Sequence, residues 1–470
     1  MRKLTLFLLA VLFIIKPFIE PLHVWGQPPL TLTAQAVVLM EQSTGRVLYA
    51  RGEHDRRYPA STTKMLTALV VMEHLALDTV VTVGGEWRGI PAGFSRVGHF
   101  EGETISVYTL LNGLLIPSGN DSAMSLAMAV ARITDGRQDL SYAEGQAIFS
   151  RLMNGYAARL GATNSNFNNP YGLHNDSHFT TAHDMALIGC AFMANPTLAQ
   201  ISARREFSTN SLGNVPHGSP NVREYTWTNT NLMLPGATHG HPYITGGRTG
   251  FTTPAGHCFV AGVHHQGMDF IAVVLYSREP DRWQDTRTLI DYGIFNYAFR
   301  EIAIAEQVIY TATIENPRLG DVDTLDILLS QSYTALLNHR EYNALMRVYT
   351  FDPLLLVGED QEHTVLRAPI AEGDILGTVE YIVPNSGLVV FSTPIVAGRQ
   401  VYERTFDSDM DYYIAMVLGN IFTRRALPIW FGFFGVVFGL FCLSIALKMN
   451  RRARRLARWQ PSEGRRRRKF

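Results

Sequence analysis

Up to about residue 300, the hydrophobic and polar residues follow two patterns, short apolar stretches typical of strands and longer runs with the spacing of helices. Short apolar stretches at 36–40 and 47–50 flank Ser43-Thr44-Gly45, a pattern typical of a hairpin. Longer runs with helical spacing predict helices over 65–72, 107–116, 122–131, 147–160 and from 181 onward. Strand-like stretches at 244–251, 257–263 and 269–276 precede an amphipathic helix over 282–299. Strands at both ends with helices between them predict an α+β domain, an antiparallel sheet flanked by helices.

The pattern changes from about Gln307, where short alternating stretches replace the longer runs. They predict a small all-β domain over 304–404, with strands at 308–314, 364–367, 375–382 and 388–392. The run Ser330–Arg347 has helical spacing instead, and we expect a helical insertion there. Asp411–Phe422 predicts an amphipathic helix within a juxtamembrane segment, 405–426.

Both ends of the chain have patterns typical of membrane proteins. Met1-Arg2-Lys3 and the largely apolar run Leu4–Ile15 indicate a secretory signal over 1–26, with an uncleaved anchor as the alternative. Leu427–Leu447 holds 21 residues without a charge, and at about 1.5 Å per residue such a helix crosses a bilayer. The basic segment 448–470 then indicates a cytoplasmic tail. We therefore expect a single-pass membrane protein with its body outside the cytoplasm, on the periplasmic side.

The charges of the chain are unevenly placed, although 41 Lys/Arg balance 41 Asp/Glu. Residues 448–470 hold eleven basic residues and one acidic residue, and residues 1–26 hold three and one. The body between them carries 27 basic and 39 acidic residues, which argues against a nucleic-acid partner. Only three cysteines occur, Cys190, Cys258 and Cys442, so the chain is no disulfide scaffold.

Candidate chemistry begins at Ser61 and Lys64. Positions three apart share one face of a helix, so we expect the Ser61 hydroxyl and the Lys64 amine side by side. A lysine can take the proton of a serine nucleophile when burial or a cationic neighbour lowers its pKa. Free N–H groups of the first helical turn can stabilise a developing oxyanion. Alone, Ser-x-x-Lys is a weak signal, because an ordinary capped helix also contains it by chance.

Two further segments follow in the order and spacing of a three-part serine-transferase site, Ser118-Gly119-Asn120 and Arg248-Thr249-Gly250. With them, the chain resembles the D-Ala-D-Ala carboxypeptidases among the low-molecular-mass penicillin-binding proteins. The resemblance extends to Asn169–Leu173, Thr180–Asp184 and Ala368–Gly373. It departs at Arg248, where lysine is usual.

The resemblance implies a β-lactamase/transpeptidase-like catalytic domain over 30–303, followed by the small all-β domain and a C-terminal transmembrane helix over 427–447. It also implies acyl transfer through an acyl-enzyme. Ser61 would attack the carbonyl of the penultimate residue, and Lys64 would act as the general base. Ser118 would pass a proton between Lys64 and the leaving amine.

The same resemblance implies a substrate-binding role for the remaining site residues. Asn120 would hold the substrate amide and Lys64. Arg248 and Thr249, with Gly250 beside them, would bind the terminal carboxylate. The backbone N–H groups of Ser61 and Phe251 would form the oxyanion hole.

The implied function is removal of the terminal D-alanine from peptidoglycan stem pentapeptides, with β-lactams as inhibitors held on the same serine. Neither a metal nor an organic cofactor is needed for this chemistry. His174, His178 and His183 lie along a loop without the spacing of a zinc site.

Three alternatives are open. An endopeptidase or transpeptidase of the same superfamily would use a similar site, and a non-catalytic penicillin-binding wall scaffold is suggested by Arg248 in place of lysine. A class A β-lactamase would need a deacylating glutamate after the second motif. The segment from Asn164 to Asp184 contains none, which argues against that class.

Overall fold

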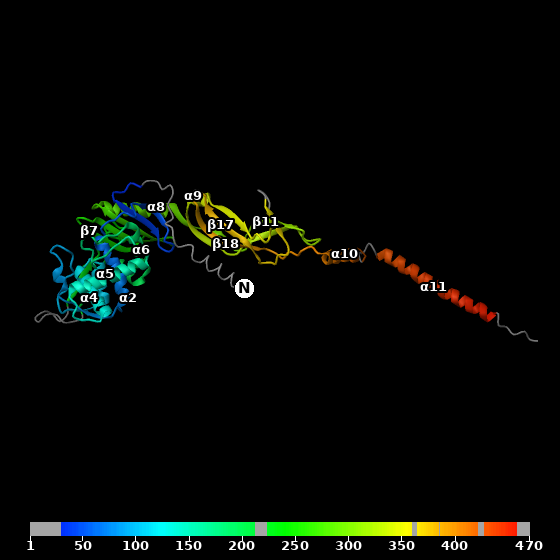
Figure 1. Ribbon diagram of the computed structural model, residues 1–470, viewed down its shortest axis with the longest axis horizontal. Helices are drawn as coiled ribbons and strands as arrows, with labels where there is room; N and C mark the ends of the chain where they lie inside the picture. Colours follow the sequence, from blue (N-terminus) through cyan, green and yellow to red (C-terminus); the bar gives the residue numbers. More distant parts are fainter. Residues whose placement is uncertain (1–29, 212–222, 360–363, 385, 422–426, 458–470) are drawn as a thin grey trace, which may run out of the picture. The chain divides into compact units, whose positions relative to one another are not determined.

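The computed structural model describes residues 30–211, 223–359, 364–384, 386–421 and 427–457 (Figure 1). The chain divides into two compact units. The first holds the residues up to Glu301 together with Thr334–Met346 and Tyr381–Val390. The second holds Ile302–Tyr333, Arg347–Glu380 and the residues from Phe391 onward.

The first unit contains a five-stranded sheet with the strand order β2-β1-β9-β8-β7, in which every pair is antiparallel. Its strands are β1 (Ala36–Glu41), β2 (Val47–Arg51), β7 (Ile244–Thr252), β8 (Gly256–His265) and β9 (Met268–Ser277). Val38 of β1 lies opposite Val273 of β9. The two ends of the unit therefore meet in one sheet, as the hydrophobic pattern predicted.

Helices pack against both faces of this sheet. Val38 and Met40 lie in one core with α2 (Lys64–His74), α4 (Asn120–Asp135) and α6 (Ala182–Ala194). Val37 and Leu39 lie in a second core with α8 (Asp281–Asn296). Successive strand residues point to opposite faces, so a sheet covered on both sides needs apolar residues at every position. This explains why β1 reads as a continuous apolar run.

The remaining elements of this unit connect the sheet and the helices. They are η1 (Ala60–Thr63), β3 (Val80–Thr82), η2 (Glu86–Gly89), β4 (Thr104–Ser106), α3 (Val107–Leu115), α5 (Tyr142–Arg159), α7 (Pro196–Ser202), β5 (Glu206–Asn210), β6 (Glu224–Thr228) and β10 (Tyr297–Ala303). The helix predicted over 282–299 ends earlier in the structure, because α8 (Asp281–Asn296) stops before Tyr297. Tyr297 is buried and its hydroxyl donates to the carbonyl of Leu48, which holds the chain extended where a helix to residue 299 was expected.

The second unit is dominated by β-structure. A seven-stranded sheet has the order β14-β17-β18-β12-β11-β16-β15, and β10 pairs separately with β13. The elements that follow β10 in the chain are β11 (Val308–Glu315), β12 (Thr324–Leu329), β13 (Tyr333–Asn338), α9 (His339–Asn343), β14 (Met346–Phe351), β15 (Leu356–Glu359), β16 (Thr364–Arg367), β17 (Ile375–Val383) and β18 (Leu388–Ala397). Of these, α9, β13 apart from Tyr333, and the adjoining ends of β17 and β18 belong to the first unit.

The helix expected over Ser330–Arg347 was wrong. The strand β13 lies in the first half of that run and β14 begins near its end, at Met346, and α9 between them has only five residues. Leu336 and Leu337 are buried on β13, so tertiary packing overrides the helical spacing of the sequence. The Asn338 side chain caps α9 together with Glu341.

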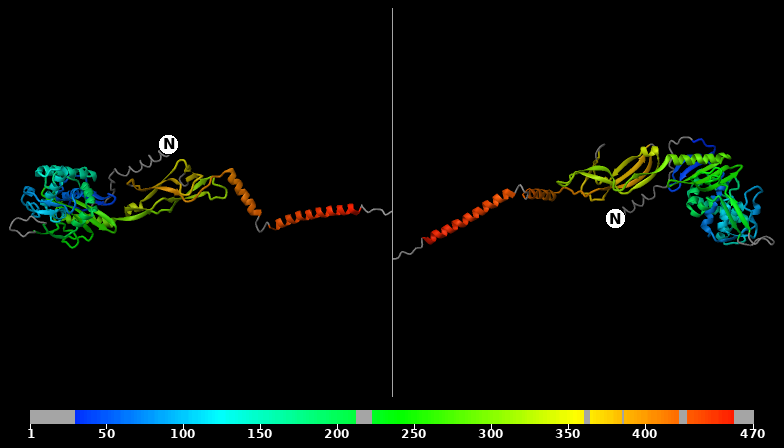
Figure 2. Two further views of the ribbon diagram at one scale, coloured as in Figure 1. Left: turned by 90° about the horizontal axis from the view of Figure 1, so that it is seen from below. Right: turned by 180° about the vertical axis from the view of Figure 1, so that it is seen from behind.

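Two helices follow the β-structure, α10 (Phe406–Ile421) and α11 (Leu427–Ala457). Figure 2 shows α11 as one continuous helix. Its segment Leu427–Arg454 has a mean hydropathy of 2.2 in its most apolar window and is long enough to cross a membrane. The predicted signal segment, 1–26, lies outside the described residues.

Candidate active site

Ser61 lies in a tight 3-10 turn, η1, that runs directly into α2. Ala60, just before it, has a φ of +48°, a left-handed conformation that side chains rarely adopt. Gly172 lies against this turn with a φ of +83°, and a Cβ placed there would be 1.8 Å from the Ala60 carbonyl oxygen. Only glycine allows this approach, so the Gly172 loop and the Ser61 turn fit together backbone to backbone.

Lys64 is fully buried, and its amine contacts three oxygen atoms. Its Nζ lies 3.0 Å from Ser61 Oγ, 2.6 Å from Asn120 Oδ1 and 3.1 Å from the Tyr171 carbonyl oxygen. Burial lowers the pKa of Lys64 well below its usual value, and the positive charge of Arg248 lowers it further. The carboxylate of Asp121 opposes both effects. The arrangement favours a neutral amine beside a serine hydroxyl.

The second motif forms a turn between α3 and α4. Ser118 has a φ of +72°, and its hydroxyl makes no hydrogen bond to any described residue. Gly119 precedes the first residue of α4, and Asn120 begins that helix. The side chain of Asn120 accepts from Lys64 and makes no capping hydrogen bond to α4. The structure therefore brings Asn120 to Lys64 but shows no contact between Ser118 and Lys64.

The third motif lies on β7, beside the Ser61 turn. A Cβ at Gly250 would be 2.9 Å from both the Pro59 carbonyl oxygen and the Ser61 backbone nitrogen, so the strand and the turn are in close contact there. Phe251, the next residue, is 55% exposed and stacks on His257 with ring centroids 4.4 Å apart. Gly250 thus allows the end of β7 to approach the nucleophile's backbone.

Arg248 is buried, with 1% of its surface exposed. Its Nη1 donates to the Leu115 carbonyl at 2.8 Å and to Thr230 Oγ1 at 3.1 Å, whereas its Nε is buried without a hydrogen-bond partner among the described residues. Thr230 Oγ1 lies 2.7 Å from Thr249 Oγ1. Burial and the charge of Arg282 lower the pKa of Arg248 to about 9, so it stays cationic at neutral pH. The Arg248 guanidinium thus donates to the Thr230 hydroxyl, which is in turn hydrogen-bonded to the Thr249 hydroxyl.

Three groups in this region had no role in the sequence-based assignment. Thr230 connects Arg248 to Thr249, and the Tyr171 carbonyl accepts from Lys64. Asn169 fixes that carbonyl's loop, because its Oδ1 accepts from the backbone nitrogens of Gly172 at 2.8 Å and Leu173 at 3.0 Å. The Asn-Pro-x-Gly-Leu segment was visible in the sequence, but a backbone carbonyl leaves no residue-type signal.

The loop histidines do not form a common centre. His178 bonds Thr63 Oγ1 at 2.9 Å, and His183 lies beside His54 with ring centroids 5.2 Å apart. Within the described part of the chain, no group of three or more His, Cys, Asp or Glu side chains is arranged to hold a metal ion.

A serine, a buried amine, a carboxamide and a cation with two hydroxyls lie together beside a sheet flanked by helices, and these are the kinds of group that serine acyl transfer of the penicillin-binding type uses. A family model described as D-alanyl-D-alanine carboxypeptidase matches residues 24–279, more than half of the chain. The chain belongs to this family, as the three motifs predicted. The resemblance and the expected enzyme class, a serine-type D-Ala-D-Ala carboxypeptidase, are therefore confirmed.

Individual proteins show the same relationship. The chain is 29% identical to the D-alanyl-D-alanine carboxypeptidase DacC of Escherichia coli, over 80% of this chain and 86% of that protein. It is similar to penicillin binding protein 5 from Haemophilus influenzae, with a TM-score of 0.56 at 25% identity over 80% of this chain and all of that one. A DD-transpeptidase from Streptomyces matches 57% of this chain and 98% of its own, at 28% identity and a TM-score of 0.51.

Proposed function

We propose that Ser61 is the nucleophile and Lys64 the general base of a D-Ala-D-Ala carboxypeptidase acting on peptidoglycan stem pentapeptides. The observation that carries this assignment is the 3.0 Å contact between Ser61 Oγ and a fully buried Lys64 amine of lowered pKa. Ser61 attacks the carbonyl of the penultimate D-alanine as Lys64 takes its proton. The free D-alanine leaves, and water then releases the shortened peptide from Ser61.

The substrate is held by groups on both sides of Ser61. The backbone N–H groups of Ser61 and Phe251 bind the oxyanion, which the close approach of Gly250 to the Ser61 turn supports. The terminal carboxylate lies against the Thr249 hydroxyl, with Arg248 behind it supplying positive charge. Asn120 binds the substrate amide as well as Lys64.

Ser118 carries the proton from Lys64 to the leaving amine. Its hydroxyl is unpartnered among the described residues and 8% of the residue is exposed, so it is free to bond a bound peptide. β-Lactams react with Ser61 by the same attack and stay on it as a slowly hydrolysed acyl group.

We further propose the layout that the sequence indicates. A signal over 1–26 directs export, the catalytic domain spans 30–303, and the β-rich domain spans 304–404. The segment 405–426 leads to a span at 427–447, and 448–470 is a cytoplasmic tail; the apolar character of α11 supports the span. Protease added to intact spheroplasts should digest the catalytic body and spare a tag placed after Phe470. Loss of the tag first would reverse this orientation.

The second candidate, a transpeptidase, is favoured by the likeness to the Streptomyces DD-transpeptidase. One experiment separates the two. The full-length protein is incubated with a muropeptide pentapeptide, alone and with an acceptor amine, and the products are identified by mass spectrometry. A carboxypeptidase releases free D-alanine and a tetrapeptide, whereas a transpeptidase gives the cross-linked product. Ser61→Ala should abolish both the release of D-alanine and covalent labelling by a fluorescent penicillin. Release of D-alanine by Ser61→Ala at the wild-type rate would reject Ser61 as nucleophile.

A further inference from the structure

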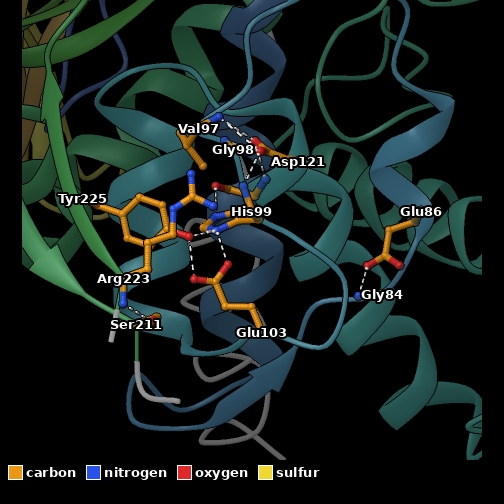
Figure 3. A network of polar contacts seen from close by, with 11 residues as sticks. Gly84, Glu86, Val97, Gly98, His99, Glu103, Asp121, Ser211, Arg223 and Tyr225 are labelled. Atoms are coloured by element: carbon orange, nitrogen blue, oxygen red, sulfur yellow. Dashed lines mark hydrogen bonds and ion pairs between the residues drawn. The ribbon is translucent and has the colours of Figure 1, made fainter. Parts of the chain in front are cut away.

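A buried polar network lies behind the Ser118–Asn120 turn, and the proposed chemistry does not use it (Figure 3). At its centre is the carboxylate of Asp121, a residue only 1% exposed. It accepts hydrogen bonds from three consecutive backbone nitrogens, those of Val97 at 3.0 Å, Gly98 at 2.8 Å and His99 at 3.1 Å. Gly98 has a φ of +86°, and this left-handed residue allows three successive N–H groups to converge on one anion.

The loop that supplies these N–H groups also holds the second motif directly. The backbone nitrogen of Asn120 donates to the Ser95 carbonyl at 3.1 Å, and Ser95 Oγ donates to the Pro117 carbonyl at 3.0 Å. Ser118, between those two points, is in a left-handed conformation that non-glycine residues keep only where their surroundings impose it. Hydrogen bonds on both sides of Ser118 therefore connect this turn to the loop whose N–H groups bond to the Asp121 carboxylate.

The far side of the loop is fixed by a second set of contacts. His99 Nε2 lies 2.9 Å from Ser122 Oγ, and its Nδ1 lies 3.3 Å from Glu103 Oε2, while the Tyr225 hydroxyl donates to Glu103 Oε1 at 2.5 Å. Figure 3 shows His99, Glu103 and Tyr225 pointing toward one another. The order serine, histidine, carboxylate is that of a hydrolase triad. Ser122, His99 and Glu103 are each at most 3% exposed, so no substrate reaches them and the set is a scaffold.

We propose that Asp121 is a positioning residue for acyl transfer, which fixes the Val97–His99 loop and thereby holds Asn120 at the Lys64 amine. Simple helix capping does not account for the contacts. Only one of them, from the Ser122 nitrogen at 3.1 Å, comes from α4 itself, and the others come from a loop more than twenty residues earlier. This inference rests on the proposed function of Ser61 and Lys64.

Asp121 also acts on Lys64 through its charge. The charged groups that face the Lys64 amine are Arg248 from β7 and Asp121 from α4, and its other neighbours are neutral: Ser61, Asn120 and the Tyr171 carbonyl. The carboxylate stabilises the ammonium form of Lys64. Removing the negative charge must therefore lower the pKa of Lys64 and move the acidic limb of the acylation profile to lower pH.

The test is Asp121→Asn in the full-length protein, measured by the rate of fluorescent-penicillin acylation from acidic to alkaline pH and by thermal unfolding. We expect acylation to slow roughly 10- to 100-fold, the range for a misplaced catalytic group. The loss should fall on the acylation rate constant and not on the dissociation constant of the drug, because Arg248 and Thr249 are untouched. The acidic limb should move to lower pH.

Asp285→Asn is the matched control. Asp285 is also a buried aspartate on a helix, the fifth residue of α8, and it accepts from two backbone nitrogens of a distant segment, Thr33 at 2.8 Å and Ala34 at 2.9 Å. It has no contact with Lys64 among the described residues. This variant should lose stability without moving the pH profile. If Asp121→Asn behaves like Asp285→Asn, with wild-type acylation per folded molecule and an unmoved limb, the positioning role is wrong.

Two further outcomes are decisive. Should Asp121→Asn fail to fold, Ser95→Ala replaces it, because it removes only an exposed bond to Pro117. Acylation several-fold slower at an unchanged melting temperature supports the role of the loop, and a wild-type rate overturns it. Failure of the wild-type protein to acylate on Ser61 would instead reject the proposed function, and this inference with it.

Discussion

The Nζ of Lys64 lies 2.6 Å from the side-chain oxygen of Asn120, closer than the 3.0 Å to the hydroxyl of Ser61. The amide oxygen of Asn120 only accepts hydrogen bonds, and so does the Tyr171 carbonyl oxygen, 3.1 Å from the same nitrogen. A neutral amine has two N–H bonds and one lone pair. With both N–H bonds directed at these two oxygens, the lone pair is left for the proton of Ser61. The two acceptors thus orient Lys64 as a base.

Replacing Asn120 with Asp tests this orientation. Aspartate has nearly the same side-chain shape as asparagine but places a carboxylate against the Lys64 amine. The negative charge stabilises the ammonium form and so raises the pKa of Lys64. We expect penicillin acylation at pH 7 to fall at least about tenfold and to recover in part at higher pH, because the acidic limb moves upward. Asn120→Ala is the comparison, and its loss should not recover with pH. An identical profile for the two variants would contradict the model of Lys64 as a base oriented by Asn120.

Arg248 provides the second prediction, because this chain has arginine where the family pattern has lysine. Arg248→Lys should keep substantial activity, whereas Arg248→Ala should lose roughly 2–4 kcal/mol of transition-state binding, the range for removing one partner of a desolvated charge pair. Loss of the cation also raises the pKa of Lys64, so the acidic limb of Arg248→Ala should move to higher pH. The measurement is D-alanine release against pH.

A modified substrate separates the two effects of Arg248. Amidating the C-terminus of the pentapeptide removes the carboxylate, so it should slow the wild-type enzyme much more than Arg248→Ala. Equal losses in the two proteins would show that Arg248 does not hold the carboxylate.

Gly172 gives a prediction about the shape of the nucleophile turn. Gly172→Ala places a methyl group 1.8 Å from the Ala60 carbonyl oxygen, so the turn or the loop must move. Gly161 has the same φ of +83°, but its nearest neighbour for a Cβ is the Leu187 side chain at 3.7 Å. Gly161→Ala should therefore cost about 1–2 kcal/mol from backbone strain alone. We expect Gly172→Ala to lose more stability in urea unfolding and to acylate far more slowly. Similar losses for both variants would mean that the close approach has no special effect.

Much of the catalytic unit could be predicted from the sequence, because its sheet is buried on both faces. β1, β7, β8 and β9 appear as apolar runs close to their observed bounds, and the three motifs mark the residues that surround Ser61. The order of the motifs was enough to predict the contact between Asn120 and Lys64, although 56 positions separate the two residues in the sequence.

What could not be predicted depends on tertiary contacts. β13 has the spacing of a helix, and only the burial of Leu336 and Leu337 shows it to be a strand. Thr230 and the Tyr171 carbonyl enter the site through contacts with Arg248 and Lys64 that no local pattern encodes. The same holds for Asp121, whose carboxylate accepts hydrogen bonds from a loop more than twenty residues earlier in the chain.

His178 provides a prediction of how stability depends on pH. It is buried beside the nucleophile turn, where the Asn168 nitrogen donates to its Nδ1 at 3.1 Å, so its Nε2 carries the proton that is donated to Thr63 Oγ1 at 2.9 Å. Burial lowers the pKa of His178 to about 3, and the neighbouring His174 adds to the shift. Folded His178 therefore stays neutral at pH values where an unfolded histidine, with a pKa near 6.5, binds a proton.

Because the unfolded chain binds more protons in this interval, the free energy of unfolding must fall as pH falls from about 6.5 toward 3. One histidine contributes up to about 1.4 kcal/mol for each pH unit. His178→Gln removes the titrating group and should flatten this part of the stability profile relative to wild type, measured by urea unfolding between pH 7 and the acid transition. The control for the substitution itself is His264→Gln, since the His264 side chain is 55% exposed and lies on β8, away from the nucleophile turn. Parallel profiles for His178→Gln and wild type would show that His178 binds a proton in the folded enzyme as it does in the unfolded chain. Both ring nitrogens would then donate, so Nδ1 would bond to Asn168 Oδ1, 3.0 Å away, and could not accept from the Asn168 nitrogen.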